Sequence, residues 1–100
     1  MKPKNTAIIV DDEKSAQETL AGLLKSYCSD FITVVDIADS VDSGIEKINK
    51  HQPDVVFLDI EMPKKNGFEL LQQYSTLPFK VVFTTAYDQY ALKAIKFSAF

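Results

Sequence analysis

A short apolar run that ends at a carboxylate is the feature that most constrains how this chain can fold. Residues 55–58 read Val-Val-Phe-Leu and stop at Asp59, with Pro63 and Gly67 close behind. A run of this length, rich in β-branched and aromatic residues, predicts a strand that is buried on both faces, as parallel strands are. Asp59 would then lie at the carboxyl end of the strand, where open α/β sheets hold their ligands.

A second apolar run, residues 7–10, also ends in acids, at Asp11 and Asp12. Taken singly, each acid is more simply explained as a turn or helix-cap residue. If the two strands are parallel neighbours, however, three carboxylates meet at one edge of the sheet and repel one another unless a cation lies among them. Oxygen ligands of this kind suit Mg2+. Together the three acids therefore predict a magnesium site.

The rest of the chain alternates between strand and helix signals. We expect strands at residues 6–10, 31–37, 55–58 and 79–84, and helices that begin near residues 15, 41, 67 and 87, the last of them running to residue 97. Strict alternation of this kind predicts right-handed crossovers and an α/β fold, a doubly wound parallel sheet with helices on both faces.

Helical spacing of apolar residues predicts the inward face of each helix. Asp39 or Ser40 can cap the second helix. The residues expected to face inward are Ala16, Leu20, Leu23, Leu24 and Tyr27 in the first helix, Val41, Ile45 and Ile48 in the second, and Phe68, Leu70, Leu71 and Tyr74 in the third.

The predicted sheet is incomplete. The fourth strand is apolar at residues 81–83, and a doubly wound sheet would normally cover it with another βα unit. The chain ends at Phe100, where that unit should begin. We therefore expect residues 1–100 to be one C-terminally incomplete domain, truncated after its fourth βα unit, with an open edge that favours a homodimer or a domain swap.

Composition excludes several classes of function. The net charge is −3, the chain has no arginine and no run of lysines, and phosphate-binding surfaces need a basic patch, so we expect no direct nucleic-acid binding by this domain. No segment reaches transmembrane length, and the amino terminus lacks a signal-peptide core. The single cysteine, Cys28, excludes an internal disulfide. A reduced, cytoplasmic location is the simplest interpretation.

Three further signals are weaker. Thr84 and Thr85 are ordinary strand residues, although a hydroxyl at this sheet edge could donate to a phosphoryl oxygen near Asp59. Pro63 and Gly67 would shape the loop after Asp59 and let an incoming group approach. His51, at the end of the second helix, is more simply a solvated residue than a catalytic base.

Three motifs in this order resemble the receiver domain of two-component response regulators. They are Ile8-Ile9-Val10-Asp11-Asp12-Glu13, the stretch from Val56 through Met62-Pro63 to Asn66-Gly67, and Val82-Phe83-Thr84-Thr85-Ala86. The resemblance covers essentially the whole chain and implies a flavodoxin/CheY-like fold. Residues 66–71 and 87–94 are also similar to regulators that carry a LytTR-type DNA-binding domain.

The resemblance implies a role for each site residue. Asp59 would accept a phosphoryl group from the phosphohistidine of a sensor histidine kinase, in a Mg2+-dependent reaction. Asp12, Asp59 and the backbone carbonyl of Glu61 would ligate Mg2+, with Asp11 acting mainly through water. Thr85 would be the switch hydroxyl. Such a domain is a phosphoacceptor that assists its own phosphorylation and dephosphorylation, not an enzyme, and it controls an output domain that is most often a transcriptional regulator.

Two alternatives stay open at this point. A pseudo-receiver would be an interaction module that is never phosphorylated. The given sequence ends before the family's fifth strand and its lysine, since Lys93 and Lys96 both lie on the preceding predicted helix, and the missing strand keeps this alternative open. A Mg2+-dependent phosphohydrolase would want a D-x-D pattern after the first strand, whereas Asp11 and Asp12 are adjacent.

Overall fold

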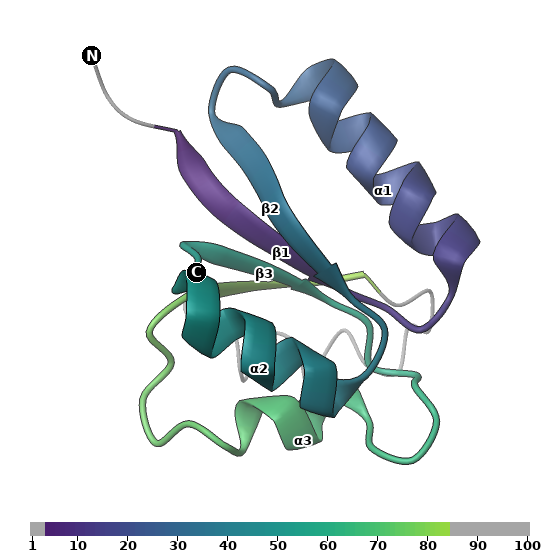
Figure 1. Ribbon diagram of the computed structural model, residues 1–100, viewed down its shortest axis with the longest axis vertical. Coiled ribbons are helices and arrows are strands. Elements are labelled where there is room, and N and C mark those ends of the chain that lie inside the picture. The colour runs from purple at the N-terminus through teal and green to yellow at the C-terminus, as the bar shows by residue number, and fades with distance from the viewer. Residues whose placement is uncertain (1–3, 85–100) are drawn as a thin grey trace.

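The structure, a computed structural model, describes residues 4–84. Its core is a four-stranded parallel sheet in the order β2-β1-β3-β4 (Figure 1). Along the chain the elements are β1 (Asn5–Val10), α1 (Lys14–Tyr27), β2 (Ile32–Ala38), α2 (Val41–His51), β3 (Val55–Leu58), α3 (Gly67–Leu71) and β4 (Lys80–Phe83). The predicted alternation and the parallel pairing of the first and third strands are confirmed. The helix predicted at residues 87–97 lies outside the described residues.

Side chains of the central strands alternate between two apolar layers, because successive residues of a strand point to opposite faces. Ala7 and Ile9 of β1 pack with Phe57 of β3 and Leu24 of α1. Their neighbours face the other way, into a larger cluster beneath α2 and α3, which includes Ile8, Val10, Val56, Leu58, Ile48 and Leu70. Both faces of the central strands are therefore buried, which explains the unbroken apolar runs at residues 7–10 of β1 and 55–58 of β3.

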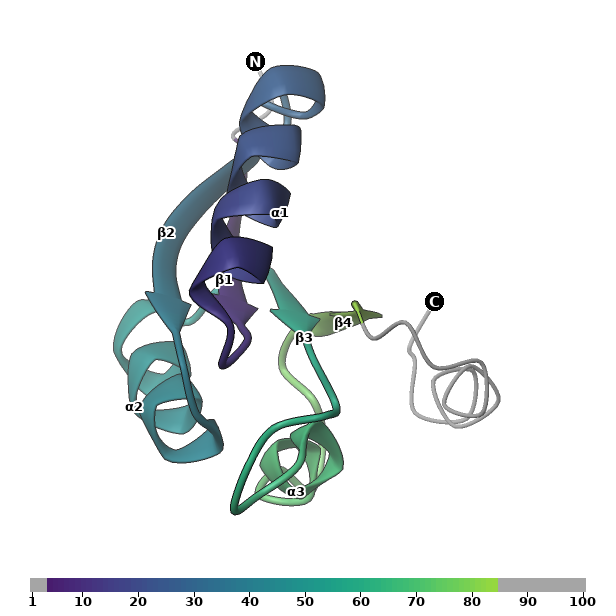
Figure 2. The same cartoon turned by 90° about the vertical axis from the view of Figure 1, so that its right-hand side faces the viewer.

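The sheet has the pronounced twist that is usual for parallel strands. In Figure 2, β2 runs nearly vertically and β4 nearly horizontally, although only β1 and β3 lie between them. The loops that follow β1 and β3 leave the sheet at the same edge. No helix within residues 4–84 is long and apolar enough to cross a membrane.

The predicted inner face of α1 is wrong in part. Leu24 is buried as expected, but Leu23 is 51% exposed and Tyr27 is 79% exposed. The face of α1 that packs on the sheet runs through Leu20, Ala21 and Leu24 to Cys28, so it is rotated away from Leu23 and Tyr27. Apolar spacing alone did not distinguish this face from the adjoining one.

The helix ends are formed by short polar contacts. Ser40, rather than Asp39, caps α2, because its hydroxyl oxygen accepts a hydrogen bond from the Ser43 N–H at 3.1 Å. At α3, Asn66 and Glu69 form a capping box, with donor–acceptor distances of 3.2 and 3.0 Å. The helix begins at Gly67 as predicted, whereas the capping role of Asn66 was not predicted.

Candidate metal centre

The register between β1 and β3 determines where the acids lie. Val10 pairs with Leu58 at the end of the ladder. The backbone N–H of the next residue, Asp59, donates to the Val10 carbonyl at 2.9 Å, and the Asp11 N–H donates to the carbonyl of Ala38 at 3.0 Å. The sheet's own hydrogen bonds therefore hold Asp11 and Asp59 side by side.

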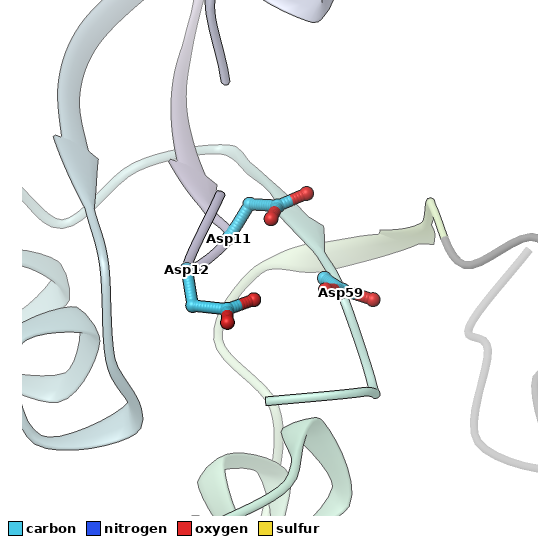
Figure 3. A group of neighbouring side chains, drawn as sticks. All are labelled: Asp11, Asp12 and Asp59. Carbon is cyan, nitrogen blue, oxygen red and sulfur yellow. The ribbon is translucent and has the colours of Figure 1, made fainter. Parts of the chain in front are cut away.

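Three carboxylates meet at this edge, as predicted. One oxygen each from Asp11, Asp12 and Asp59 lies within 4.8 Å of the other two. Figure 3 shows Asp11 and Asp12 extending from the end of β1 and Asp59 from the end of β3. We call this group the acidic cluster.

Contacts from α1 hold the β1–α1 loop in place. The Asp11 carboxylate is buried and accepts the Glu13 N–H at 2.9 Å, and the Asp11 backbone carbonyl accepts from Nε2 of Gln17 at 2.6 Å. This role of Gln17 could not be predicted, because a polar residue in the first turns of an amphipathic helix gives no signal of its own. It fixes the backbone of Asp11 without touching the cluster's carboxylates.

The electrostatics of the cluster favour a cation. Burial and the neighbouring charges of Asp11, Asp12 and Glu13 raise the pKa of Asp59 to about 6, although the Glu61 N–H donates to its Oδ1 at 3.2 Å and partly offsets them. Within the described residues, Oδ1 of Asp12 is buried and has no hydrogen-bond partner. An unpartnered buried carboxylate oxygen is costly, and a hard cation would satisfy it. The donor set therefore fits Mg2+.

Gly67 is required by a close backbone approach. A Cβ at this position would lie 2.6 Å from the carbonyl oxygen of Asp59 and 3.0 Å from the Cα of Ile60. The Gly67 N–H also donates to the Ile60 carbonyl at 3.0 Å. Gly67 therefore lets the loop after β3 pack closely against the backbone of Asp59. The sequence suggested instead that this glycine leaves room for an incoming group.

The middle of this loop is strained and tethered. Lys64 has a positive φ of 69°, which side chains with a Cβ rarely adopt. The Lys65 ammonium lies 2.9 Å from Oδ1 of Asp42, in the first turn of α2. Glu61, whose backbone carbonyl the resemblance assigns to the metal, is exposed on the same loop.

Of the other predicted site residues, Thr84 lies at the expected edge. Its N–H donates to the Leu58 carbonyl at 3.0 Å, and it lines a cavity of about 330 Å³ together with Asp11. Thr85 lies outside the described residues. His51 is half-buried, with Nε2 3.0 Å from the Asp36 carboxylate, so it belongs to an ion cluster on α2 and β2 and is less solvated than predicted.

Comparison with known proteins agrees with this geometry. Residues 7–100 match the family model of the response regulator receiver domain. The chain belongs to this family. The receiver domain binds Mg2+ at an acidic pocket in this family, and its members are generally not enzymes.

The relatives of this receiver domain are longer regulators. A response regulatory protein of Vibrio cholerae is 50% identical over 97 residues, which are 95% of this chain and 40% of that protein. The sensory transduction protein LytT of Enterococcus faecalis is 42% identical over 95 residues, 92% of this chain and 38% of LytT. The chain thus spans about two fifths of the length of these curated relatives.

Solved structures agree with the fold. The signal receiver domain of the response regulator NarL from Mycobacterium tuberculosis superimposes with a TM-score of 0.80 at 29% identity, covering 98% of this chain and 81% of that one. The response regulator domain of Thermotoga maritima CheB, at 24% identity, has a TM-score of 0.79 and covers 97% and 75%. The predicted CheY-like receiver fold is therefore confirmed.

Proposed function

We propose that this receiver domain is a phosphoacceptor, with Asp59 as the residue that takes up the phosphoryl group. The observation that carries the proposal is the acidic cluster, in which Asp59 stands at the end of β3 beside Asp11 and Asp12. A carboxylate at the mouth of a parallel sheet is accessible to an incoming group, and its neighbours supply a place for the cation that phosphoryl transfer needs.

Asp12, Asp59 and the backbone carbonyl of Glu61 would hold Mg2+, and Asp11 would contact it mainly through water. Bound there, the ion supplies neutralisation of the charge on the transferring phosphoryl group. The unpartnered Oδ1 of Asp12 supports this assignment. Gln17 and Gly67 act on the site indirectly, since each fixes the backbone of a residue that carries an acid.

The transfer itself forms one bond and breaks another. An oxygen of the Asp59 carboxylate attacks phosphorus of a kinase phosphohistidine, the P–N bond breaks, and the imidazole leaves and takes up a proton. Water later attacks the acyl phosphate and returns Asp59 and inorganic phosphate. The chain's part is to orient the carboxylate, so its contribution is mostly positioning.

The partners follow from the relatives. We propose a sensor histidine kinase as the phosphoryl donor and, by similarity to LytT, an output domain of the LytTR DNA-binding type, acting in a cytoplasmic pathway. Thr85 would donate its hydroxyl to a phosphoryl oxygen on Asp59. Such a contact reorders nearby backbone and so passes the signal on.

Intact-mass measurement tests the assignment. The chain is incubated with acetyl phosphate with and without Mg2+, together with Asp59→Asn and with Asp30→Asn, which removes an exposed acid of the α1–β2 turn. We expect one added phosphoryl group on the parent and on Asp30→Asn, only with Mg2+, and none on Asp59→Asn.

Two outcomes would contradict the proposal. Phosphorylation of the Asp59→Asn variant would show that another residue accepts the phosphoryl group. A lack of phosphorylation in the parent, repeated on a chain that includes a fifth βα unit, would favour the pseudo-receiver alternative.

A further inference from the structure

A cavity of about 410 Å³ lies between the C-terminal half of α1 and β2, which run side by side in Figure 1. We call it the α1–β2 groove. It is at the other end of α1 from the acidic cluster and shares no lining residue with it. Its volume is within the range of about 300–1,000 Å³ that is typical of ligand sites. Its floor is apolar and consists of Ala21, Leu24, Ile32, Val34 and Ile37.

The charge of the groove is opposite to that of the chain. Among residues 4–84, the charged residues that line it are Lys4 and Lys25, whereas the whole chain carries a net charge of −3. Within residues 4–84, neither lysine makes an ion pair. An apolar floor with unpaired cations at its rim is complementary to a surface that is apolar in the middle and acidic at its edges.

Two exposed aromatic residues lie at the connection between α1 and β2, next to the groove's lining residues in the sequence. Tyr27, in the last turn of α1, is 79% exposed, and Phe31, directly before Ile32, is 53% exposed. These rings adjoin the groove's lining residues in the sequence, at the turn between α1 and β2. Exposed aromatic side chains are typical of protein-binding surfaces, which favours a protein as the occupant of the groove.

We propose that the α1–β2 groove docks an acidic amphipathic helix of a partner protein. Its apolar side chains, at positions i, i+3 or i+4 and i+7, would enter the groove, and its flanking carboxylates would face Lys4 and Lys25. The proposal goes beyond the phosphoacceptor function and does not depend on it, because no residue of the groove belongs to the acidic cluster.

The test is a nuclear magnetic resonance titration of the isotope-labelled chain with a synthetic helical peptide of about 15 residues, long enough to form a helix. The peptide carries leucines at i, i+3, i+4 and i+7 with flanking glutamates, and its counterpart carries lysines in place of the glutamates. We expect saturable shifts of the Ala21, Leu24 and Val34 amides, and an affinity about tenfold lower for the lysine peptide.

Charge reversal on the protein supplies the matched arm. Lys25→Glu should lower the affinity for the acidic peptide by about tenfold and raise the affinity for the lysine peptide. Lys50→Glu, an exposed lysine in the last turn of α2, should change neither affinity. Both variants should still be phosphorylated at the parent's rate with acetyl phosphate, which separates this inference from the proposed function.

Several results would overturn the inference. They are shifts that do not saturate at millimolar peptide, saturable shifts that map away from the groove, equal affinity for the two peptides, and an affinity that Lys25→Glu leaves unchanged.

Discussion

Ionisation of Asp59 at neutral pH destabilises the folded chain. The contribution of Asp59 to the free energy of unfolding therefore depends on pH with a definite sign. Burial and the charges of Asp11 and Asp12 raise the pKa of Asp59 to about 6, above the value of about 3.9 that an unfolded aspartate has. The folded state therefore binds the proton more tightly. The contribution of Asp59 to stability is unfavourable above pH 6 and improves as the pH falls from 6 to 4.

Asp59→Asn should consequently stabilise the metal-free chain at pH 7.5. Because Asp59 is partly in contact with solvent, we expect a gain of only about 1 to 2 kcal/mol in the free energy of unfolding. Urea unfolding in EDTA at pH 7.5 and pH 4 measures it, and the gain should vanish at pH 4. Asp30→Asn is the control, and an equal gain at both pH values would contradict the electrostatic cause.

Two glycines should respond oppositely to alanine. Gly67→Ala drives a Cβ to 2.6 Å from the Asp59 carbonyl oxygen, whereas a Cβ at Gly22, in the exposed face of α1, meets nothing within 4 Å. We expect Gly67→Ala to cost about 2 to 4 kcal/mol and Gly22→Ala to add about 1 kcal/mol, by helix propensity. Thermal and urea unfolding measure both, and a neutral Gly67→Ala would show that the loop relaxes freely.

Lys64 holds a left-handed backbone conformation that glycine adopts without strain. With φ at 69°, Lys64→Gly should raise the free energy of unfolding by about 1 kcal/mol, because the clash of its Cβ is removed. Lys64→Ala is the matched control, since it removes the charge but keeps the Cβ, and it should give no gain. Equal stabilisation by both changes would point to charge instead of backbone strain.

At the scale of elements, α2 is fastened to β2 by a small ion cluster. Asp36 of β2 lies 3.3 Å from the Lys47 ammonium and 3.0 Å from Nε2 of His51. The same side chains also satisfy the edge of the sheet, because Ile37 donates its N–H to Asp36 at 2.8 Å and its carbonyl accepts from Lys47. At Ile37, therefore, the backbone groups of this edge are not available for pairing with another strand.

Asp36→Asn should therefore destabilise the chain at neutral pH. Burial raises the pKa of Asp36, but the hydrogen bonds from Ile37, His51 and Lys47 outweigh it, so the pKa is lowered overall. The stabilisation is present above the unfolded value of about 3.9 and is lost as the pH falls through the lowered one. We expect a loss of about 1 kcal/mol at pH 7.

Urea unfolding at pH 7 and pH 3 checks this prediction, and the loss should shrink at pH 3. The control is Asp42→Asn, which breaks the more exposed pair with Lys65. Equal losses in the free energy of unfolding from the two variants would mean that the partial burial of Asp36 adds nothing to the stability that its ion pairs provide.

Most elements could be predicted from the sequence because each has a simple physical signal. The strands alternate with helices, and the acids directly follow the apolar runs of the two central strands, so the acidic cluster followed from a parallel register. What escaped prediction depends on contacts between elements. The rotation of α1 that exposes Leu23 and Tyr27, the Asp36–His51 pair and the Gln17 bond to Asp11 are set by packing, which periodicity does not encode.

At the scale of the whole molecule, the two outer strands differ. The edge of β2 is occupied by side chains at Ile37, whereas β4, which has the apolar residues Val81, Val82 and Phe83, ends the described sheet. A strand edge with free backbone groups is where a further strand can add to a sheet, so we expect the described sheet to extend along β4 and not along β2.

The hydrogen bond from the Asp59 N–H to the Val10 carbonyl is the last rung of the β1–β3 ladder, and it has a kinetic consequence. The acids are brought together only in chains whose strands are paired at this end of the ladder, so chains unpaired there lack the assembled cluster. A ligand that binds the native state but not the transition state for folding slows unfolding without speeding folding. We therefore expect magnesium to lower the unfolding rate of this domain and to leave its folding rate unchanged.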